Sequence, residues 1–184
     1  LNIKFGENMN KEQLAKEIYD VSNIRGEFLL RSGITATEYF DKYLFEANPR
    51  ILRSIAQHLS SLLPEGFDQL AGLEMGGIPI ATAVSLATDS PVLFVRKEAK
   101  AYGTCKLAEG GDIQGKELVI IEDVVTSGGA IIDAVKEIRE RGAVVNKVLC
   151  VIDREGSGRA NLEALGLEFS ALFTKSELER TAEF

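Results

Sequence analysis

Short apolar runs alternate with amphipathic stretches over most of the chain. Continuous apolar runs predict strands that are buried on both faces, and apolar residues spaced three or four apart predict helices. From residue 65 onward the two patterns follow each other in turn. The expected strands are 68–74, 91–96, 117–123, 143–153 and 167–173, and the expected helices are 78–87, 130–141, 159–165 and a short one at the end of the chain.

This alternation predicts an α/β fold with a mostly parallel sheet flanked by helices. Before it come a helix over 11–22, a hairpin over 27–43, and a helix that starts after Asn48 with Pro49 in its first turn and ends near Pro64. We expect a single domain over residues 1–184. It would comprise an N-terminal helix-and-hairpin hood over about 1–45 and a core sheet over 65–175.

The stretch from Lys97 to Gly115 breaks the alternation. It runs for about 19 residues with little apolar content, whereas connections in α/β units usually take about 2–6 residues. It opens with the basic run RKEAK, at 96–100. Such a run is most often a solvated surface segment, but its position in an overlong loop favours a flexible catalytic loop over 97–115.

Composition narrows the classes of function. A chain of 184 residues suits one domain, and a net charge of −7 argues against non-specific nucleic-acid binding. No apolar run approaches the roughly 20 residues of a membrane span, so we expect no membrane partner. Cys105 and Cys150 show no metal-ligand or redox spacing, and the sequence shows no export signal, which favours the cytoplasm. The only histidine, His58, falls on an expected amphipathic helix, and we interpret it as a structural or surface residue.

The segment Leu118–Ala130, LVIIEDVVTSGGA, carries the clearest chemistry. A buried strand leads to Glu122 and Asp123, then to the run Thr126–Gly129, and then to a helix. Small residues at a helix start let backbone N–H groups surround a phosphate. Two acids beside a phosphate loop are explained if the ligand also has hydroxyls, as a ribose 5-phosphate does. The alternative is a simple cluster of helix-capping side chains. The complete order of strand, two acids, TSGG and helix favours the ligand site.

This segment resembles the signature of the type I phosphoribosyltransferases. Four further segments resemble the orotate phosphoribosyltransferase family, in its order: FLLRSGITATEYFD, GLEMGGIPIATAV, VRKEAKAYGTCKLAEG and VIDREG. The resemblance implies a type I phosphoribosyltransferase fold and an enzyme that joins orotate to phosphoribosyl pyrophosphate (PRPP), giving orotidine 5′-monophosphate and pyrophosphate in pyrimidine biosynthesis. It also implies a homodimer whose catalytic loop is shared across the interface.

The resemblance further implies residue roles. Lys100 and Asp123 are the expected catalytic residues. The residues expected to bind PRPP are Arg31, Met75, Gly76, Arg96, Lys97, Lys100, Tyr102, Glu122, Asp123, Val124, Val125, Thr126, Ser127, Gly128, Gly129 and Ala130. Those expected beside orotate are Tyr39, Phe40, Thr126 and Arg154. Two positions depart from the family: Arg31 replaces the commoner lysine, and Tyr102 stands where many members have histidine.

Breaking the bond to pyrophosphate leaves positive charge on the ribose and negative charge on the leaving group. Arg96, Lys97 and Lys100, with Mg²⁺ bridging pyrophosphate oxygens and no direct protein ligand, would neutralise the latter. Arg154 suits the orotate carboxylate, although an ion pair with Asp153 or Glu155 is an alternative. Two rival functions remain: transfer to another nucleobase, and a regulator that senses PRPP.

Overall fold

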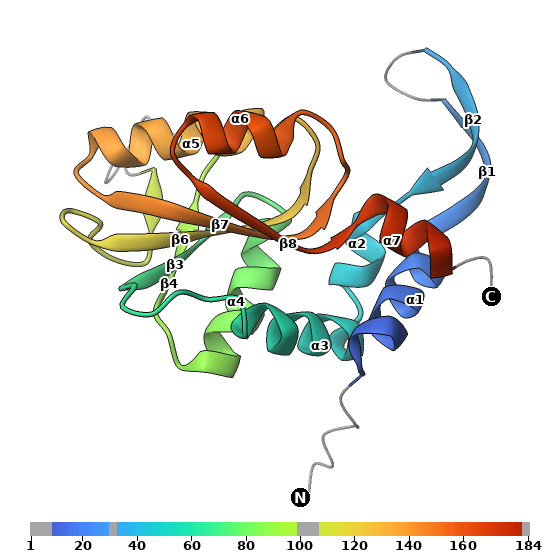
Figure 1. Ribbon diagram of the computed structural model, residues 1–184, viewed down its shortest axis with the longest axis horizontal. Coiled ribbons are helices and arrows are strands. Elements are labelled where there is room, and N and C mark those ends of the chain that lie inside the picture. Colours follow the sequence, from blue (N-terminus) through green and yellow to red (C-terminus); the bar gives the residue numbers. More distant parts are fainter. Residues whose placement is uncertain (1–8, 30–32, 99–106, 182–184) are drawn as a thin grey trace, which may run out of the picture.

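The computed structural model describes residues 9–29, 33–98 and 107–181 (Figure 1). Its main sheet has six strands in the order β5-β4-β3-β6-β7-β8. The parallel strands are β3 (Gln69–Leu73), β4 (Val92–Val95), β6 (Glu117–Val125), β7 (Val144–Asp153) and β8 (Glu168–Thr174). The edge strand β5 (Ala108–Glu109) is antiparallel to β4. The predicted α/β class and mostly parallel sheet are confirmed.

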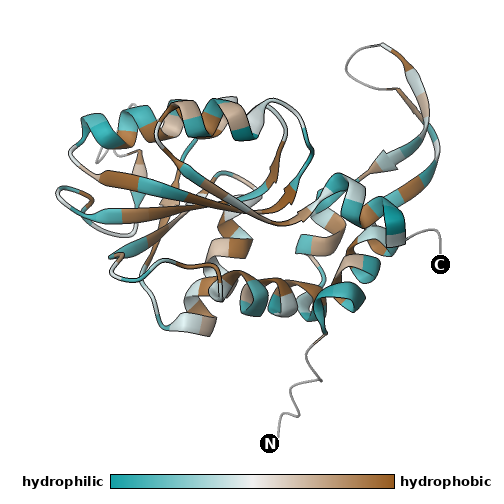
Figure 2. Cartoon of the chain, viewed as in Figure 1, coloured by the Kyte–Doolittle hydropathy of each residue, from teal (hydrophilic) through white to brown (hydrophobic). Residues whose placement is uncertain are grey.

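Helices cover both faces of this sheet. Helices α3 (Pro49–Ser60) and α4 (Gly77–Thr88) lie on one face, and α5 (Gly129–Glu140) and α6 (Gly158–Ala164) lie on the other (Figure 1). Alternate residues of β6 serve the two cores, because Val119 packs with the α3 and α4 side and Ile120 with the α5 and α6 side. The brown apolar strands of Figure 2 therefore lie between two layers of helices.

The hood consists of α1 (Lys11–Ser22) and an antiparallel hairpin of β1 (Asn23–Leu29) and β2 (Thr35–Phe40). A capping box between Asn10 and Gln13 starts α1 where the sequence predicts it. The hairpin extends away from the core sheet, and the C-terminal helix α7 (Lys175–Arg180) packs against α1 (Figure 1). The predicted helix and hairpin are both present, although the hairpin spans residues 23–40 instead of 27–43.

Three local features differ from the expectation. A short helix, α2 (Lys42–Glu46), follows the hairpin, and its five residues are too few to show a helical period. Helix α3 ends at Ser60 instead of near Pro64. Within the expected loop 97–115, the short strand β5 pairs with β4, so part of that stretch belongs to the sheet. Residues 99–106 of the loop lie outside the described residues.

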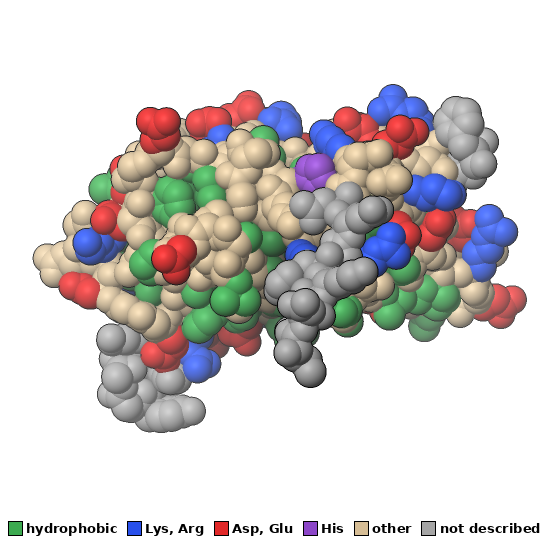
Figure 3. Space-filling model, turned by 90° about the horizontal axis from the view of Figure 1, so that it is seen from below, with side chains coloured by type: hydrophobic (Ala, Val, Ile, Leu, Met, Phe, Trp, Pro, Cys, Tyr) green, Lys and Arg blue, Asp and Glu red, His purple; other side chains and the backbone are tan. Residues whose placement is uncertain are grey.

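His58 has a structural environment, as predicted. Its Nε2 atom lies 2.9 Å from the carbonyl oxygen of Met9, which joins α3 to the segment that leads into α1. The purple side chain in Figure 3 is this histidine, and on that face basic side chains are interspersed with acidic ones. Among the helices of the described residues, none is both long enough and apolar enough to span a membrane.

Candidate active site

The direction in which successive strands are added to the sheet reverses between β3 and β6. From β3 the chain passes through α4 to β4 on one side, and from β6 it passes through α5 to β7 on the other. In open α/β sheets ligands bind in the crevice at the carboxyl ends of the strands where this switch occurs. The loop containing Met75 and Gly76 follows β3, and the loop Thr126–Gly128 follows β6. The fold therefore brings two predicted binding segments, about 50 residues apart in sequence, to one crevice.

The two acids lie on the sheet itself. We expected Glu122 and Asp123 at the C-terminal end of a strand over 117–123, but β6 continues to Val125. Asp123 is only 1% exposed, and Glu122 is half-buried. The Asp123 amide donates a hydrogen bond of 3.0 Å to Oε1 of Glu122, and the Val124 amide donates one to Oδ1 of Asp123. These bonds hold both carboxylates at the rim of the crevice.

Two residues of α2, a lysine and a glutamate, join these acids, and neither was expected from the sequence. Lys42 forms an ion pair with Oδ2 of Asp123, and Glu46 buries its carboxyl group beside the same aspartate. Asp41 caps the helix by accepting a hydrogen bond from the Tyr43 amide. Lys42 and Glu46 are four residues apart, so they lie on the same helical face. This four-residue spacing is visible in the sequence, but it indicates a shared face only if the segment is known to be a helix, and no helix was predicted there.

Gly76 passes very close to this cluster. A Cβ atom on Gly76 would lie 1.6 Å from Oδ2 of Asp123 and 3.0 Å from Oε1 of Glu46. No side chain fits in that space, so the backbone of the loop after β3 can approach Asp123 only because residue 76 is glycine. The two halves of the crevice meet at this point.

The cluster has unusual protonation chemistry. Burial, followed by the effect of the neighbouring Asp123 carboxylate, raises the pKa of Glu46 to about 8. Burial and the neighbouring Asp123 charge also raise the pKa of Glu122 well above its ordinary value. Burial alone would lower the pKa of Lys42, but the hydrogen bond and charge of Asp123 outweigh it and raise that pKa. The cluster therefore carries less negative charge at neutral pH than its three acids suggest.

The loop after β6 has the geometry of an anion site. Thr126 and Ser127 are exposed, Gly128 has the positive φ of 74° that glycine adopts most easily, and α5 begins at Gly129. Within the part of the chain that the structure describes, no side chain caps the N-terminus of α5. Its first N–H groups are therefore free to bind an anion, and the capping alternative does not describe this helix. The Asn161 side chain steadies the loop by donating a hydrogen bond of 2.9 Å to the Ser127 carbonyl.

The start of the basic segment lies beside the same helix. Arg96, Lys97, Gly129 and Ala130 line a cavity of about 490 Å³, together with acids that include Glu74 and Asp133. The Lys97 amide donates a hydrogen bond of 3.1 Å to Glu74, and Arg96 lies 3.5 Å from Glu109. The fold thus brings the base of the expected catalytic loop to the first turn of α5. Arg96 and Lys97 can face an anion held there.

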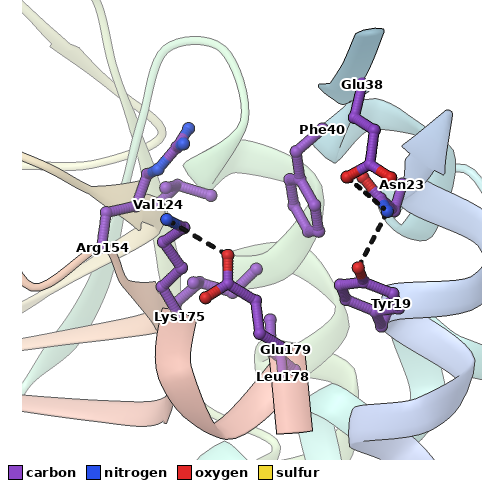
Figure 4. Close-up of a pocket in the computed structure, with 10 residues that line it drawn as sticks. Tyr19, Asn23, Glu38, Phe40, Val124, Arg154, Lys175, Leu178 and Glu179 are labelled. Carbon is purple, nitrogen blue, oxygen red and sulfur yellow. Dashed lines mark hydrogen bonds and ion pairs between the residues drawn. The ribbon is translucent and has the colours of Figure 1, made fainter. Parts of the chain in front are cut away.

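A second cavity, of about 170 Å³, lies between the hood and the ends of β6 and β7 (Figure 4). Phe40 enters it from β2, and Arg154 enters it from the residue after β7. Val124 forms part of its wall. The remaining lining residues were not expected from the sequence: Tyr19 from α1, Asn23 and Glu38 from the hairpin, Ile152 from β7, and Lys175, Leu178 and Glu179 from α7. The hood and α7 contribute most of them. These two parts of the chain are far apart in sequence, so no local pattern joins them.

The Arg154 side chain is exposed and is not held by its acidic neighbours. Asp153 instead pairs with Arg159 at 3.3 Å, and Glu155 accepts hydrogen bonds from Ser176. Among the described residues, the ion pair considered as an alternative for Arg154 is therefore not formed. Its guanidinium group is available to a ligand.

Not all expected site residues come together. The Tyr39 ring packs on Phe28, with 5.5 Å between the ring centroids, and Tyr39 does not line the cavity that Phe40 enters. Successive strand residues point to opposite faces, so the expected aromatic pair is divided. Met75 is 60% exposed near Arg96 and Glu109. Arg31, Lys100 and Tyr102 lie outside the described residues.

A family profile and the sequences of related proteins all indicate the phosphoribosyltransferases. The profile described as "Phosphoribosyl transferase domain" matches residues 44–164. The orotate phosphoribosyltransferase of a Nocardioides species is 53% identical over 170 residues, which cover 92% of this chain and 95% of that protein. The orotate phosphoribosyltransferase of Methanocaldococcus jannaschii is 41% identical over 172 residues, which cover 93% of this chain and 98% of that protein.

Solved structures show the same relation. The crystal structure of Mycobacterium tuberculosis orotate phosphoribosyltransferase in complex with PRPP aligns with a TM-score of 0.80 and 26% identity. The alignment covers 92% of this chain and 98% of that one. The similarity therefore extends over the hood as well as the core sheet.

Proposed function

This chain belongs to the orotate phosphoribosyltransferase family, and we propose that it transfers the 5-phosphoribosyl group from PRPP to orotate. The products would be orotidine 5′-monophosphate and pyrophosphate. The observation that carries the proposal is the crevice between β3 and β6, where Gly76 lies against the buried Asp123 beside an uncapped phosphate loop. The relative crystallised with PRPP, at 26% identity, supports the same donor.

The donor would bind along this crevice. The N–H groups of Gly128 and Gly129, with the hydroxyls of Thr126 and Ser127, would hold the 5′-phosphate. Glu122 and Asp123 would accept hydrogen bonds from the ribose hydroxyls. Their proximity to the ring also favours the positive charge that develops there as the bond to pyrophosphate breaks.

The leaving group would be stabilised by the basic segment that follows β4. Arg96 and Lys97, near Gly129 in the cavity of about 490 Å³, are placed to approach the pyrophosphate. We assign Lys100 as the catalytic residue of the loop, with Met75 and Tyr102 as further contacts. Closure of that loop would exclude water, which would otherwise intercept the developing cation.

Mg²⁺ is part of the proposal as the cofactor. The groups at this edge fit the ion, because the carboxylates of Glu122 and Asp123 and the hydroxyls of Thr126 and Ser127 lie beside the phosphate site. Among the described residues, no cysteine or histidine lines the neighbouring cavity of about 490 Å³. Mg²⁺ usually keeps several waters and binds substrate phosphates, so pyrophosphate oxygens and water would hold it. Bound there, it would stabilise negative charge on the leaving group.

Orotate would occupy the cavity between Phe40 and Arg154 (Figure 4). A guanidinium group binds a carboxylate with two parallel hydrogen bonds, and an aromatic ring packs on the flat pyrimidine. Thr126 would contribute from the neighbouring loop. We assign no direct contact to Tyr39, because its ring packs on Phe28 instead.

The assembly and location belong to the same proposal. We propose a homodimer in which the loop over 97–115 reaches the partner's site, and a cytoplasmic enzyme with reduced thiols. Cys150 is buried and free, which agrees with a reducing compartment.

The decisive experiment follows the loss of orotate absorbance when PRPP and Mg²⁺ are added to the purified protein. We expect conversion by the wild type, none after chelation of the metal with EDTA, and recovery when Mg²⁺ is restored. A Lys100→Ala variant should bind PRPP but turn over far more slowly. A panel of other nucleobases tests the rival acceptor, and product formed from a purine instead of orotate would refute the assignment. PRPP binding without any nucleotide product would favour the regulator.

A further inference from the structure

The carboxyl group of Glu46 has no part in the function proposed above, yet it lies inside the acidic cluster. The residue is only 6% exposed, and its Oε1 atom has no hydrogen-bond partner among the described residues. Buried polar atoms are nearly always hydrogen-bonded, so an unpartnered one in a binding crevice calls for an explanation. Its position in α2 is fixed by the Asp41 cap and by Phe45, which is fully buried in the core.

The neighbours of Glu46 are mainly acidic. Asp123 faces it from β6 and Asp41 stands at the start of its own helix, and among the described residues Lys42 is the cation that acts on it. The loop after β3 contributes only the uncharged backbone of Gly76. Lys42 pairs with Asp123 rather than with Glu46, although four-residue spacing commonly pairs a lysine with a glutamate. If every acid were ionised, one ammonium group would face several carboxylates.

A shared proton resolves this arrangement. Two ionised carboxylates can only accept hydrogen bonds, whereas a protonated one can donate to the other. A methyl group on Gly76 would lie within 3.0 Å of both Oδ2 of Asp123 and Oε1 of Glu46, so these oxygens converge on one point. Such a bond would provide the partner that Oε1 lacks.

We propose that Glu46 is a positioning residue that keeps its proton and donates a hydrogen bond to the Asp123 carboxylate. Together with Lys42, it holds that carboxylate in the orientation that accepts the ribose hydroxyls of PRPP. The inference rests on the proposed function, because that function assigns ribose binding to Asp123. Burial, supported by the neighbouring Asp123 carboxylate, raises the pKa of Glu46 to about 8, so the proton is present at neutral pH. Its loss in alkali would break the bond and add a repelling charge.

The test compares the wild type with Glu46→Gln and Glu46→Ala, through kcat/KM for PRPP measured from about pH 6 to about pH 10. Glutamine keeps the shape and an N–H donor but cannot ionise. We expect the wild type to lose about tenfold in kcat/KM per pH unit above a pKa of about 8. Glu46→Gln should stay within about threefold of wild type near pH 7 and lack this alkaline loss. Glu46→Ala should raise the KM for PRPP more than that for orotate.

Parallel alkaline losses in wild type and Glu46→Gln would overturn the proposal, and so would a glutamine variant as defective near neutrality as the alanine variant. Thermal unfolding gives a readout that needs no activity. A folded-state pKa of about 8, against an ordinary value of 4.5, means that wild-type stability falls as pH rises through this window. The melting temperature of Glu46→Gln relative to wild type should therefore rise from about pH 5 to about pH 8 and then level off.

A constant difference in melting temperature across that range would also count against a protonated Glu46. The two hypotheses remain separable. If the wild type forms no orotidine 5′-monophosphate at any pH, the proposed function fails, while the unfolding data still report whether Glu46 holds a proton.

Discussion

The backbone amide of Arg154 donates a hydrogen bond of 2.8 Å to the carbonyl oxygen of Val125. This bond joins the residue after β7 to the last residue of β6, directly before Thr126. The position of Arg154 beside the phosphate loop is therefore set by its backbone, and its side chain can be replaced without moving the loop. The orotate and phosphate sites can be tested separately for this reason.

Replacing Arg154 with alanine should raise the KM for orotate far more than that for PRPP. A charged hydrogen bond contributes about 1.5–3 kcal/mol, so we expect an increase of roughly tenfold to a hundredfold for orotate. Steady-state kinetics with each substrate varied in turn measure both constants. Arg154→Lys is the matched control, and it should recover only part of the loss, because lysine cannot form two parallel bonds. Equal effects on both substrates would remove Arg154 from the orotate site.

A Gly76→Ala substitution should act mainly on the donor. The added methyl would lie 1.6 Å from Oδ2 of Asp123, so either the loop after β3 or the carboxylate must move. We expect the KM for PRPP to rise by about tenfold or more, with a smaller effect on orotate. Gly26→Ala in β1 is the control, since its methyl would meet only the Phe28 ring, at 3.1 Å. Unchanged PRPP kinetics in Gly76→Ala would contradict the close approach.

Replacing Lys42 with methionine should destabilise the fold and weaken PRPP binding. Asp123 would lose its cation in a buried site, which we expect to lower the free energy of unfolding by about 1–3 kcal/mol at neutral pH. The raised pKa of Lys42 means that its contribution is complete below its ordinary value of 10.5 and disappears as pH rises above it. Urea unfolding at neutral and strongly alkaline pH should therefore show a difference from wild type that shrinks in alkali.

The control for that experiment is Lys16→Met, which removes an exposed ion pair with Asp20. Exposed pairs of this spacing contribute little, so its unfolding free energy should change by less than about 0.5 kcal/mol. A Lys42 variant that is no less stable than the Lys16 variant would show that the ion pair with Asp123 does not hold the site together.

Mixing two inactive variants tests the shared loop. Lys100→Ala removes the loop residue, and Asp123→Asn removes the ribose contact. If the loop serves the partner's site, one of the two sites in each mixed dimer has both wild-type residues. Equal mixing and exchange of subunits should then restore about a quarter of the wild-type activity. Light scattering would establish the dimer independently, and an inactive mixture of exchanged dimers would mean that each loop serves its own subunit.

The sequence by itself determined the layer architecture and the donor site. Residues close together in sequence determine both features. Apolar runs such as LVII predict strands buried on two faces. The order EDVVTSGG places two acids, a phosphate loop and the start of a helix within one strand–turn–helix unit. Such a unit needs no distant partner to be interpreted. For the same reason α1, with its capping box, and α3, with Asn48 before Pro49, begin where they were predicted to begin.

Tertiary structure alone decided which distant residues meet those segments. The strand order brought Gly76 against Asp123, and the short helix α2 carried Lys42 and Glu46 to the same carboxylate. The pleat of β2 turned Tyr39 away from the cavity that Phe40 enters. The physical reason is that burial, close approach and a shifted pKa depend on neighbours in space, which a local pattern of residues does not encode.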